Sequence, residues 1–121
     1  MTEFQHQAML FKWAMQASVR AKYPCLKLLF HIPNGGRRDK IEAMNLKRAG
    51  VKSGVPDLCL PVKAKGYNSL YIEMKDDKGT ESKEQIWWGE ELAKKGSLYR
   101  CCNGWKKAVE VIEEYLEGVE I

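Results

Sequence analysis

Residues 69–75 read Ser-Leu-Tyr-Ile-Glu-Met-Lys, and the rest of the fold can be placed around them. Apolar residues alternate there with polar or aromatic ones, which is typical of a β-strand whose successive side chains point to opposite faces. Glu73 and Lys75 therefore share one face, about 7 Å apart at their Cα atoms. The three alternating aliphatic residues share the other face. The stretch predicts a strand that holds a carboxylate beside an ammonium group.

A second strand is predicted at residues 57–62, joined to the first by a loop with turn-forming residues. If this hairpin closes with Val62 opposite Asn68, Asp57 lies opposite Glu73. Two carboxylates that close repel each other and tend to bind protons. A divalent cation removes this penalty, and hard oxygen ligands select Mg²⁺ or Mn²⁺. The hairpin thus predicts a metal site.

The approach to Asp57 favours a fixed geometry, because Gly54 permits a tight bend and Pro56 restricts its own φ and the preceding residue. Each part also has a simpler interpretation when taken alone. The Asp could be a solvated residue in a plain turn. Glu73 and Lys75 could form an ion pair on an exposed strand, worth roughly 0–1 kcal/mol. Their occurrence together, in this order and spacing, favours a functional site.

The remaining elements follow from periodicity and from helix start and stop signals. Helices are predicted at residues 3–22, 38–49 and 82–95, with a last helix capped by Asn103, and further strands at 26–32 and 97–102. The order is α-β-α-β-β-α-β-α, which predicts the α/β class with a central mixed β-sheet flanked by helices. With 121 residues and no repeat or linker, residues 1–121 are expected to form a single domain.

The composition bounds the class of protein. The net charge is +4, yet residues 108–121 contain five Glu and no Lys or Arg, so the first 107 residues carry about +9. This imbalance favours a polyanionic partner such as nucleic acid, although a basic surface can also serve solubility alone. The four cysteines form no Cys-x-x-Cys pair, so free thiols are expected instead of a zinc site. The chain has no apolar run of membrane-spanning length and no secretory-like start, so no membrane association and a cytoplasmic location are expected.

The motifs also occur together in a known family. Gly54-Val55-Pro56-Asp57-Leu58, followed by Tyr71-Ile72-Glu73-Met74-Lys75 and then by Gln85 on the next helix, resembles the VRR-NUC domain of the PD-(D/E)XK nuclease superfamily. Pro33-Asn34-Gly35-Gly36 and Glu3 on the first helix fit the same family. The resemblance extends from about residue 3 to about residue 116.

This resemblance implies a restriction-endonuclease-like fold and an endonuclease that hydrolyses DNA phosphodiester bonds with Mg²⁺ or Mn²⁺ and needs no small-molecule cofactor. Asp57 and Glu73 would hold the metal ion, and Glu3 would add a ligand directly or through water. Lys75 would position or deprotonate the attacking water, and Gln85 would orient Lys75 or that water. Short stand-alone members, from phages and bacteria, resemble Holliday-junction resolvases, which implies a homodimer acting on branched DNA.

Alternatives stay open at several of these positions. Gln85 follows Ser82 at capping-box spacing, so it could be a helix cap. Glu3 could be a solvated first-turn residue favoured by the helix dipole. The whole chain could be a non-catalytic nucleic-acid-binding module of the same fold, or a hydrolase of RNA.

A basic segment precedes Asp57 and is expected to grip the DNA backbone. Such contacts carry no base information, so recognition of DNA shape is expected; a solvated helix face is the alternative. Trp87 and Trp88 are adjacent on a predicted helix and point in different directions, which favours core or dimer packing over stacking on a base. The predicted DNA-binding residues are Arg37, Arg38, Lys40, Lys47, Arg48 and Lys52.

Overall fold

The computed structural model describes residues 1–33 and 39–117. Within these residues four strands form one sheet in the order β1-β2-β3-β4. The first three are antiparallel neighbours and β4 runs parallel to β3, so the sheet is mixed, as predicted. The strands are β1 (Phe30–His31), β2 (Leu58–Leu60), β3 (Leu70–Lys75) and β4 (Leu98–Asn103).

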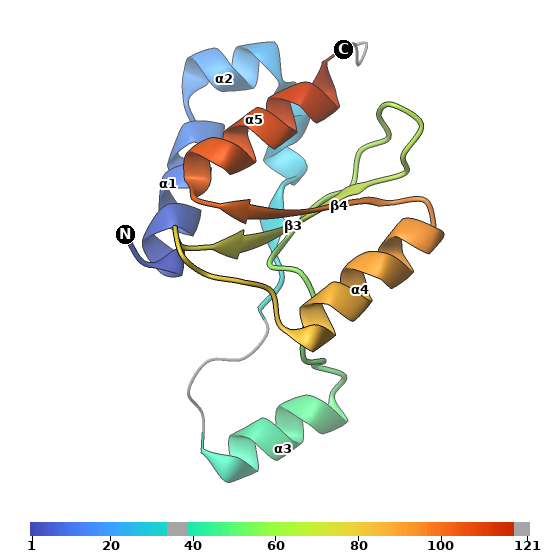
Figure 1. The fold of residues 1–121 in the computed structure, drawn as a ribbon. Coiled ribbons are helices and arrows are strands. Elements are labelled where there is room, and N and C mark those ends of the chain that lie inside the picture. Colours follow the sequence, from blue (N-terminus) through green and yellow to red (C-terminus); the bar gives the residue numbers. More distant parts are fainter. Residues whose placement is uncertain (34–38, 118–121) are drawn as a thin grey trace.

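Helices flank the sheet on both sides (Figure 1). α1, α2 and α5 lie on one side and α4 on the other, while α3 is set apart from the sheet. Among the described residues, no helix combines the length and the apolar character needed to cross a bilayer. The helices are α1 (Glu3–Ala14), α2 (Ala17–Lys22), α3 (Lys40–Arg48), α4 (Lys83–Lys94) and α5 (Trp105–Leu116). This arrangement confirms the predicted α/β class.

The register between β2 and β3 is the predicted one. Leu58 pairs with Ile72 and Leu60 pairs with Leu70, so the hairpin is aligned as a symmetric closure requires. The aliphatic residues of β3 are fully buried in the core that α1 and α5 cover. A slip of one residue would turn this apolar set away from the core, so burial fixes the register. The opposite face of β3 is then left to Glu73 and Lys75, on the side of α4.

The strand predicted at residues 26–32 is wrong over most of its length. Pro24–Leu28 forms a 3₁₀ helix, and the strand is reduced to Phe30–His31. Pro24 stands at the start of this helix, where its fixed φ is suitable and its missing N–H costs nothing. A short apolar run cannot by itself distinguish a strand from a buried helical turn, and Leu26 is the residue that enters the core.

Two helix boundaries also differ from the prediction. The helix predicted at 3–22 is interrupted between Ala14 and Ala17 and so forms two helices. Asn103 does not cap the last helix: it ends β4, and Gly104, with φ of 98°, precedes α5. The Asn103 side chain instead donates to two carbonyl oxygens of the loop that follows β3. The side-chain amide is therefore used to hold that loop.

Candidate active site

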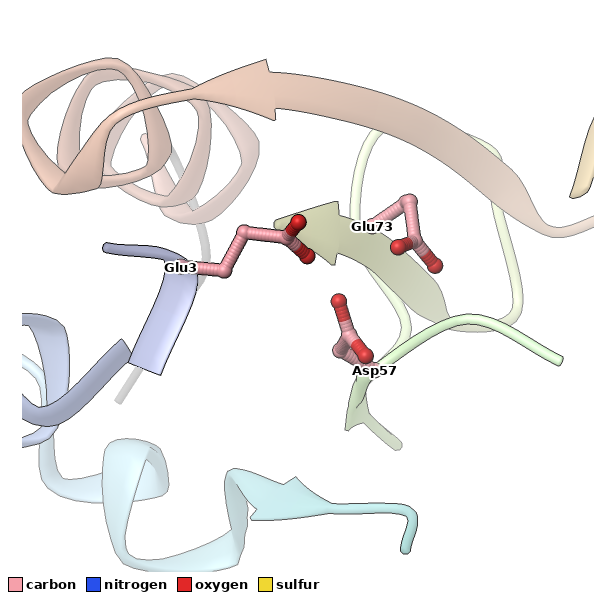
Figure 2. A group of neighbouring side chains, drawn as sticks. All are labelled: Glu3, Asp57 and Glu73. Atoms are coloured by element: carbon pink, nitrogen blue, oxygen red, sulfur yellow. The ribbon is translucent and has the colours of Figure 1, made fainter. Parts of the chain in front are cut away.

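Three carboxylates converge at one end of the sheet (Figure 2). Glu3 comes from the first turn of α1, Asp57 from the residue before β2, and Glu73 from β3. One carboxylate oxygen from each lies within 4.8 Å of the other two. Their burial is graded, since Glu3 is exposed, Asp57 is half-buried and Glu73 is buried. The cluster is therefore open to solvent on the side of Glu3.

Asp57 is held by both its main chain and its side chain. Gly54 lies at φ +89° against Glu84 at the start of α4, so close that an added Cβ would lie 2.6 Å from the Glu84 Cβ. The Asp57 carbonyl accepts a hydrogen bond from the N–H of Ile32 at 2.7 Å. Its Oδ2 accepts from the N–H of Met74 at 2.8 Å. The carboxylate is thus fixed relative to β3 before any ligand binds.

Glu73 and Lys75 are both buried on the same face of β3. Their side chains are only 3% and 11% exposed, and the Lys75 Nζ lies 3.8 Å from the Glu73 Oε2. Burial, and then the neighbouring carboxylate of Asp57, raises the pKa of Glu73 to about 9, although Lys75 opposes the shift. Without a cation, Glu73 is therefore protonated at neutral pH and hydrogen-bonded to Asp57.

Gln85 is both a helix cap and a neighbour of the carboxylate cluster. Its Oε1 accepts from the N–H of Ser82 at 2.8 Å, and the Ser82 hydroxyl accepts from the N–H of Gln85, so the capping box is complete. Its Nε2 donates to the Glu73 Oε2 at 3.1 Å. The two interpretations of Gln85 left open by the sequence are thus compatible.

Glu3 is delivered by a well-anchored helix. Thr2 and Gln5 form the predicted capping box at the start of α1. One turn further along, the buried His6 accepts a hydrogen bond on Nδ1 from the N–H of Trp105 at 3.1 Å. The His6 Nε2 lies 3.7 Å from a carboxylate oxygen of Asp77. These contacts tie α1 to the start of α5 and to the loop after β3.

Two contacts around the cluster were not anticipated from the sequence. The Met74 N–H that holds Asp57 is a backbone group, so no side-chain motif could have shown it. His6 could have been noticed as a histidine one turn from Glu3, yet its partner is 99 residues away. Both contacts position the acidic residues and do not add a charge.

The predicted DNA-binding residues lie outside the carboxylate cluster. Lys40, Lys47 and Arg48 are exposed on α3, and Lys52 is exposed on the loop that follows. None of the residues of α3, all of which the structure describes, is buried. Arg37 and Arg38 lie outside the described residues, as does most of the Pro33–Gly36 segment.

The donor set fits a small, hard divalent cation. Three carboxylate oxygens lie within 4.8 Å of one another, so side-chain rotations that bring them to about 4 Å or less would let each one lie near 2.1 Å from a shared Mg²⁺ or Mn²⁺ ion. The raised pKa of Glu73 agrees with this, because burial and then the nearby Asp57 carboxylate disfavour ionisation of Glu73, and added positive charge would oppose both effects. The amide of Gln85 and the ammonium of Lys75 border the same oxygens.

Comparison with known proteins agrees with this geometry. The VRR-NUC domain family matches residues 2–106, which is most of the chain. A solved structure named VRR_NUC domain protein superposes with a TM-score of 0.78 at 28% sequence identity, covering 97% of this chain and 89% of its own. No curated protein matches. The chain therefore belongs to the VRR-NUC domain family, whose domain is a PD-(D/E)XK nuclease.

Proposed function

We propose that this protein is a Mg²⁺- or Mn²⁺-dependent DNA endonuclease that hydrolyses phosphodiester bonds at the carboxylate cluster. The observation that carries the proposal is the convergence of Glu3, Asp57 and Glu73 within 4.8 Å, with the Lys75 Nζ 3.8 Å from Glu73. Acidic residues alone are common on protein surfaces. Here, in contrast, the acid Glu73 and the neighbouring Lys75 are both buried. Burying two ionisable groups side by side destabilises a fold, so such a pair indicates a functional site.

Each residue has a definite role in this proposal. Glu3, Asp57 and Glu73 hold the cation, which when bound neutralises phosphate charge and lowers the pKa of water. Lys75 is positioned to orient the attacking water and to stabilise negative charge that develops on the phosphate. Gln85 keeps Glu73 oriented through its Nε2 hydrogen bond while its Oε1 caps α4. The Met74 N–H keeps Asp57 in place.

The substrate is proposed to be branched DNA, and the active form a homodimer. The family resemblance supports both. Exposed Lys40, Lys47, Arg48 and Lys52, together with Arg37 and Arg38, would hold the phosphate backbone. Such contacts fix orientation without reading sequence, which is suitable for recognising DNA shape. A cytoplasmic location, either in a bacterium or in a phage-infected host, belongs to the same proposal.

Cleavage of labelled linear, flap and four-way DNA in Mg²⁺, Mn²⁺ or EDTA tests the activity and its substrate together. We expect cutting with either cation, none with EDTA, and a preference for branched substrates. Binding without cutting in all three conditions would instead identify a non-catalytic module. Cutting of RNA in preference to every DNA would show that the substrate is wrong.

Two variants test the assignment of the site. Asp57→Asn and Lys75→Ala should each reduce cleavage at least about 10²-fold, because each removes a group placed at the reacting centre, while DNA binding persists. Cation-dependent cutting retained by purified Asp57→Asn protein would contradict the assignment. Light scattering that shows a monomer both alone and on DNA would contradict the dimer.

A further inference from the structure

The start of α4 carries an aromatic surface that the proposed hydrolysis does not use. A cavity of about 800 Å³ lies between this helix and the loop that leads to Asp57. Trp87 is 56% exposed there and stands edge-on to Trp88, with ring centroids 5.5 Å apart and an interplanar angle of 84°. The residues that line the cavity are Lys52, Ser53, Lys83, Glu84, Trp87 and Trp88; we call it the tryptophan pocket.

The pocket is built on a fixed frame. The Trp88 Nε1 donates to the Ser53 carbonyl at 3.0 Å, which fastens the loop to the helix. The next residue, Gly54, lies directly against the backbone of Glu84 and so adds a second contact between the loop and α4. Both walls are therefore held before a ligand arrives. In contrast to Trp88, Trp87 has most of its surface in water, so packing within this chain does not account for it.

The pocket also lies beside the carboxylate cluster. From Ser53 to Asp57 the chain spans at most about 14 Å when fully extended, which is about four nucleotide steps along one DNA strand. On the helix side, Gln85 donates to the Glu73 carboxylate at 3.1 Å and directly follows Glu84, which lines the pocket. A strand bound at the cluster therefore passes within reach of the pocket.

We propose that the tryptophan pocket binds an unpaired base of the DNA substrate by stacking it on Trp87. The charge of the lining selects this occupant: Lys52 and Lys83 can contact the phosphates on either side, whereas the carboxylate of Glu84 disfavours a phosphate inside the pocket. A base has a flat apolar face and no charge, so it suits the exposed indole. Duplex DNA keeps its bases stacked and cannot fill the pocket.

This inference rests on the proposed nuclease function and narrows its substrate to DNA with unpaired bases near the cut. Binding is measured in EDTA, so that no cleavage occurs, on three labelled DNAs: a duplex, the same duplex with an unpaired flap, and the flap strand alone. Trp87→Ala should weaken binding of the flap and the single strand about tenfold or more. It should leave duplex binding unchanged within twofold.

Two further variants distinguish loss of base stacking from unfolding and from the removal of any exposed apolar side chain. Trp87→Phe keeps an aromatic face and should retain most of the affinity for unpaired DNA. Ile86→Ala removes an apolar side chain that is 45% exposed on the same helix but outside the pocket, and should bind all three DNAs like the wild type. Thermal unfolding of each variant confirms that the fold is intact.

The outcomes distinguish the inference from the proposed function. Equal weakening of duplex and unpaired DNA by Trp87→Ala, or no weakening of either, overturns the inference even if the protein cleaves DNA. A change in mass on light scattering of Trp87→Ala without DNA also overturns it, because Trp87 would then cover a second copy of the chain. A selective loss on unpaired DNA in a protein that cleaves nothing supports the pocket and refutes the nuclease.

Discussion

Gln85 shows how one side chain can serve both the helix and the carboxylate cluster. Its two ends are used separately, since Oε1 accepts from Ser82 and Nε2 donates to Glu73. Gln85→Glu keeps the acceptor for the capping box but loses the donor to Glu73. We expect the cleavage rate to fall at least tenfold. The free energy of unfolding should stay within about 1 kcal/mol of the wild-type value, because the cap of α4 is kept. Steady-state cleavage and urea unfolding measure the two quantities.

Gln85→Ala is the matched comparison, because it removes both interactions. It should lose cleavage and, in addition, about 0.5–2 kcal/mol of stability. If Gln85→Glu cleaves as fast as the wild type, the hydrogen bond to Glu73 has no role in the reaction and only the cap remains.

Glu73 makes the stability of the metal-free protein depend on pH. Its pKa is raised to about 9 in the folded state, mainly by burial, and is about 4.3 in an unfolded chain. The folded state therefore keeps a proton that the unfolded state loses. The stabilisation is complete below about pH 4.3 and is lost progressively as the pH rises to about 9, by an amount on the order of a few kcal/mol.

Thermal unfolding in EDTA between pH 6 and pH 9 checks this sign. The Tm of the wild type should fall by at least about 5 °C more than that of Glu73→Gln, which has no proton to lose at this position. Adding Mn²⁺ should raise the wild-type Tm more at pH 9 than at pH 6, because the cation competes with the proton. Parallel pH profiles of wild type and variant would show that Glu73 is ionised without metal.

At the scale of elements, the loop before β2 depends on the close approach of Gly54 to α4. Gly54 and Gly50 both have positive φ, at +89° and +103°, but only Gly54 has atoms within 4 Å of an added Cβ. Gly50→Ala should therefore cost about 1–2 kcal/mol from backbone strain alone. Gly54→Ala should cost about 1–3 kcal/mol more, because the Glu84 backbone must move. Urea unfolding compares the two variants.

The two glycine variants should also differ in activity. Displacing the Gly54 loop moves Asp57 relative to Met74 and Glu73, so cleavage should fall by about 10²-fold, whereas Gly50→Ala should cleave normally. Equal stability losses in the two variants would mean that the loop relaxes away from α4 at no cost.

The elements also show where sequence reasoning succeeds. The β2–β3 register could be predicted, because side-chain alternation and a short loop leave one alignment that buries the aliphatic face. The structure of the stretch after Pro24 could not be predicted, because a few consecutive apolar residues are compatible with either a strand or a helical turn. Asn103 has a side chain suited to a helix cap, but its amide instead donates to two carbonyl oxygens of the loop after β3, which is distant in sequence.

Across the whole molecule, the hardest feature to predict is the position of Glu3. Asp57 and Glu73 are neighbours across one hairpin, so local geometry brings them together. Glu3 reaches them only because α1 packs on β3 and α5, and His6 joins α1 to Trp105 at the other end of the chain. No periodicity encodes such a contact. Only the family resemblance pointed to Glu3.

The distribution of charge over the whole chain leads to the last prediction. α3 has no buried residue among those described and does not join the core, and its last turn carries Lys47 and Arg48. If these residues contact DNA phosphates, Lys47→Gln/Arg48→Gln should weaken binding of every DNA. The slope of log K against log salt should become shallower by up to about 1.8, since each phosphate contact contributes about 0.9.

Lys94→Gln/Lys95→Gln is the matched control, because it also neutralises two cations at the end of a helix. Both double variants remove positive charge from the C-terminal end of a helix, so the loss of interaction with the helix dipole is similar in the two. A difference between their salt slopes therefore reports contact with DNA. The control should keep the wild-type salt slope, and both double variants should unfold within about 1 kcal/mol of the wild type. Equal slopes for the two pairs would remove α3 from the DNA interface and leave it as a solvated helix.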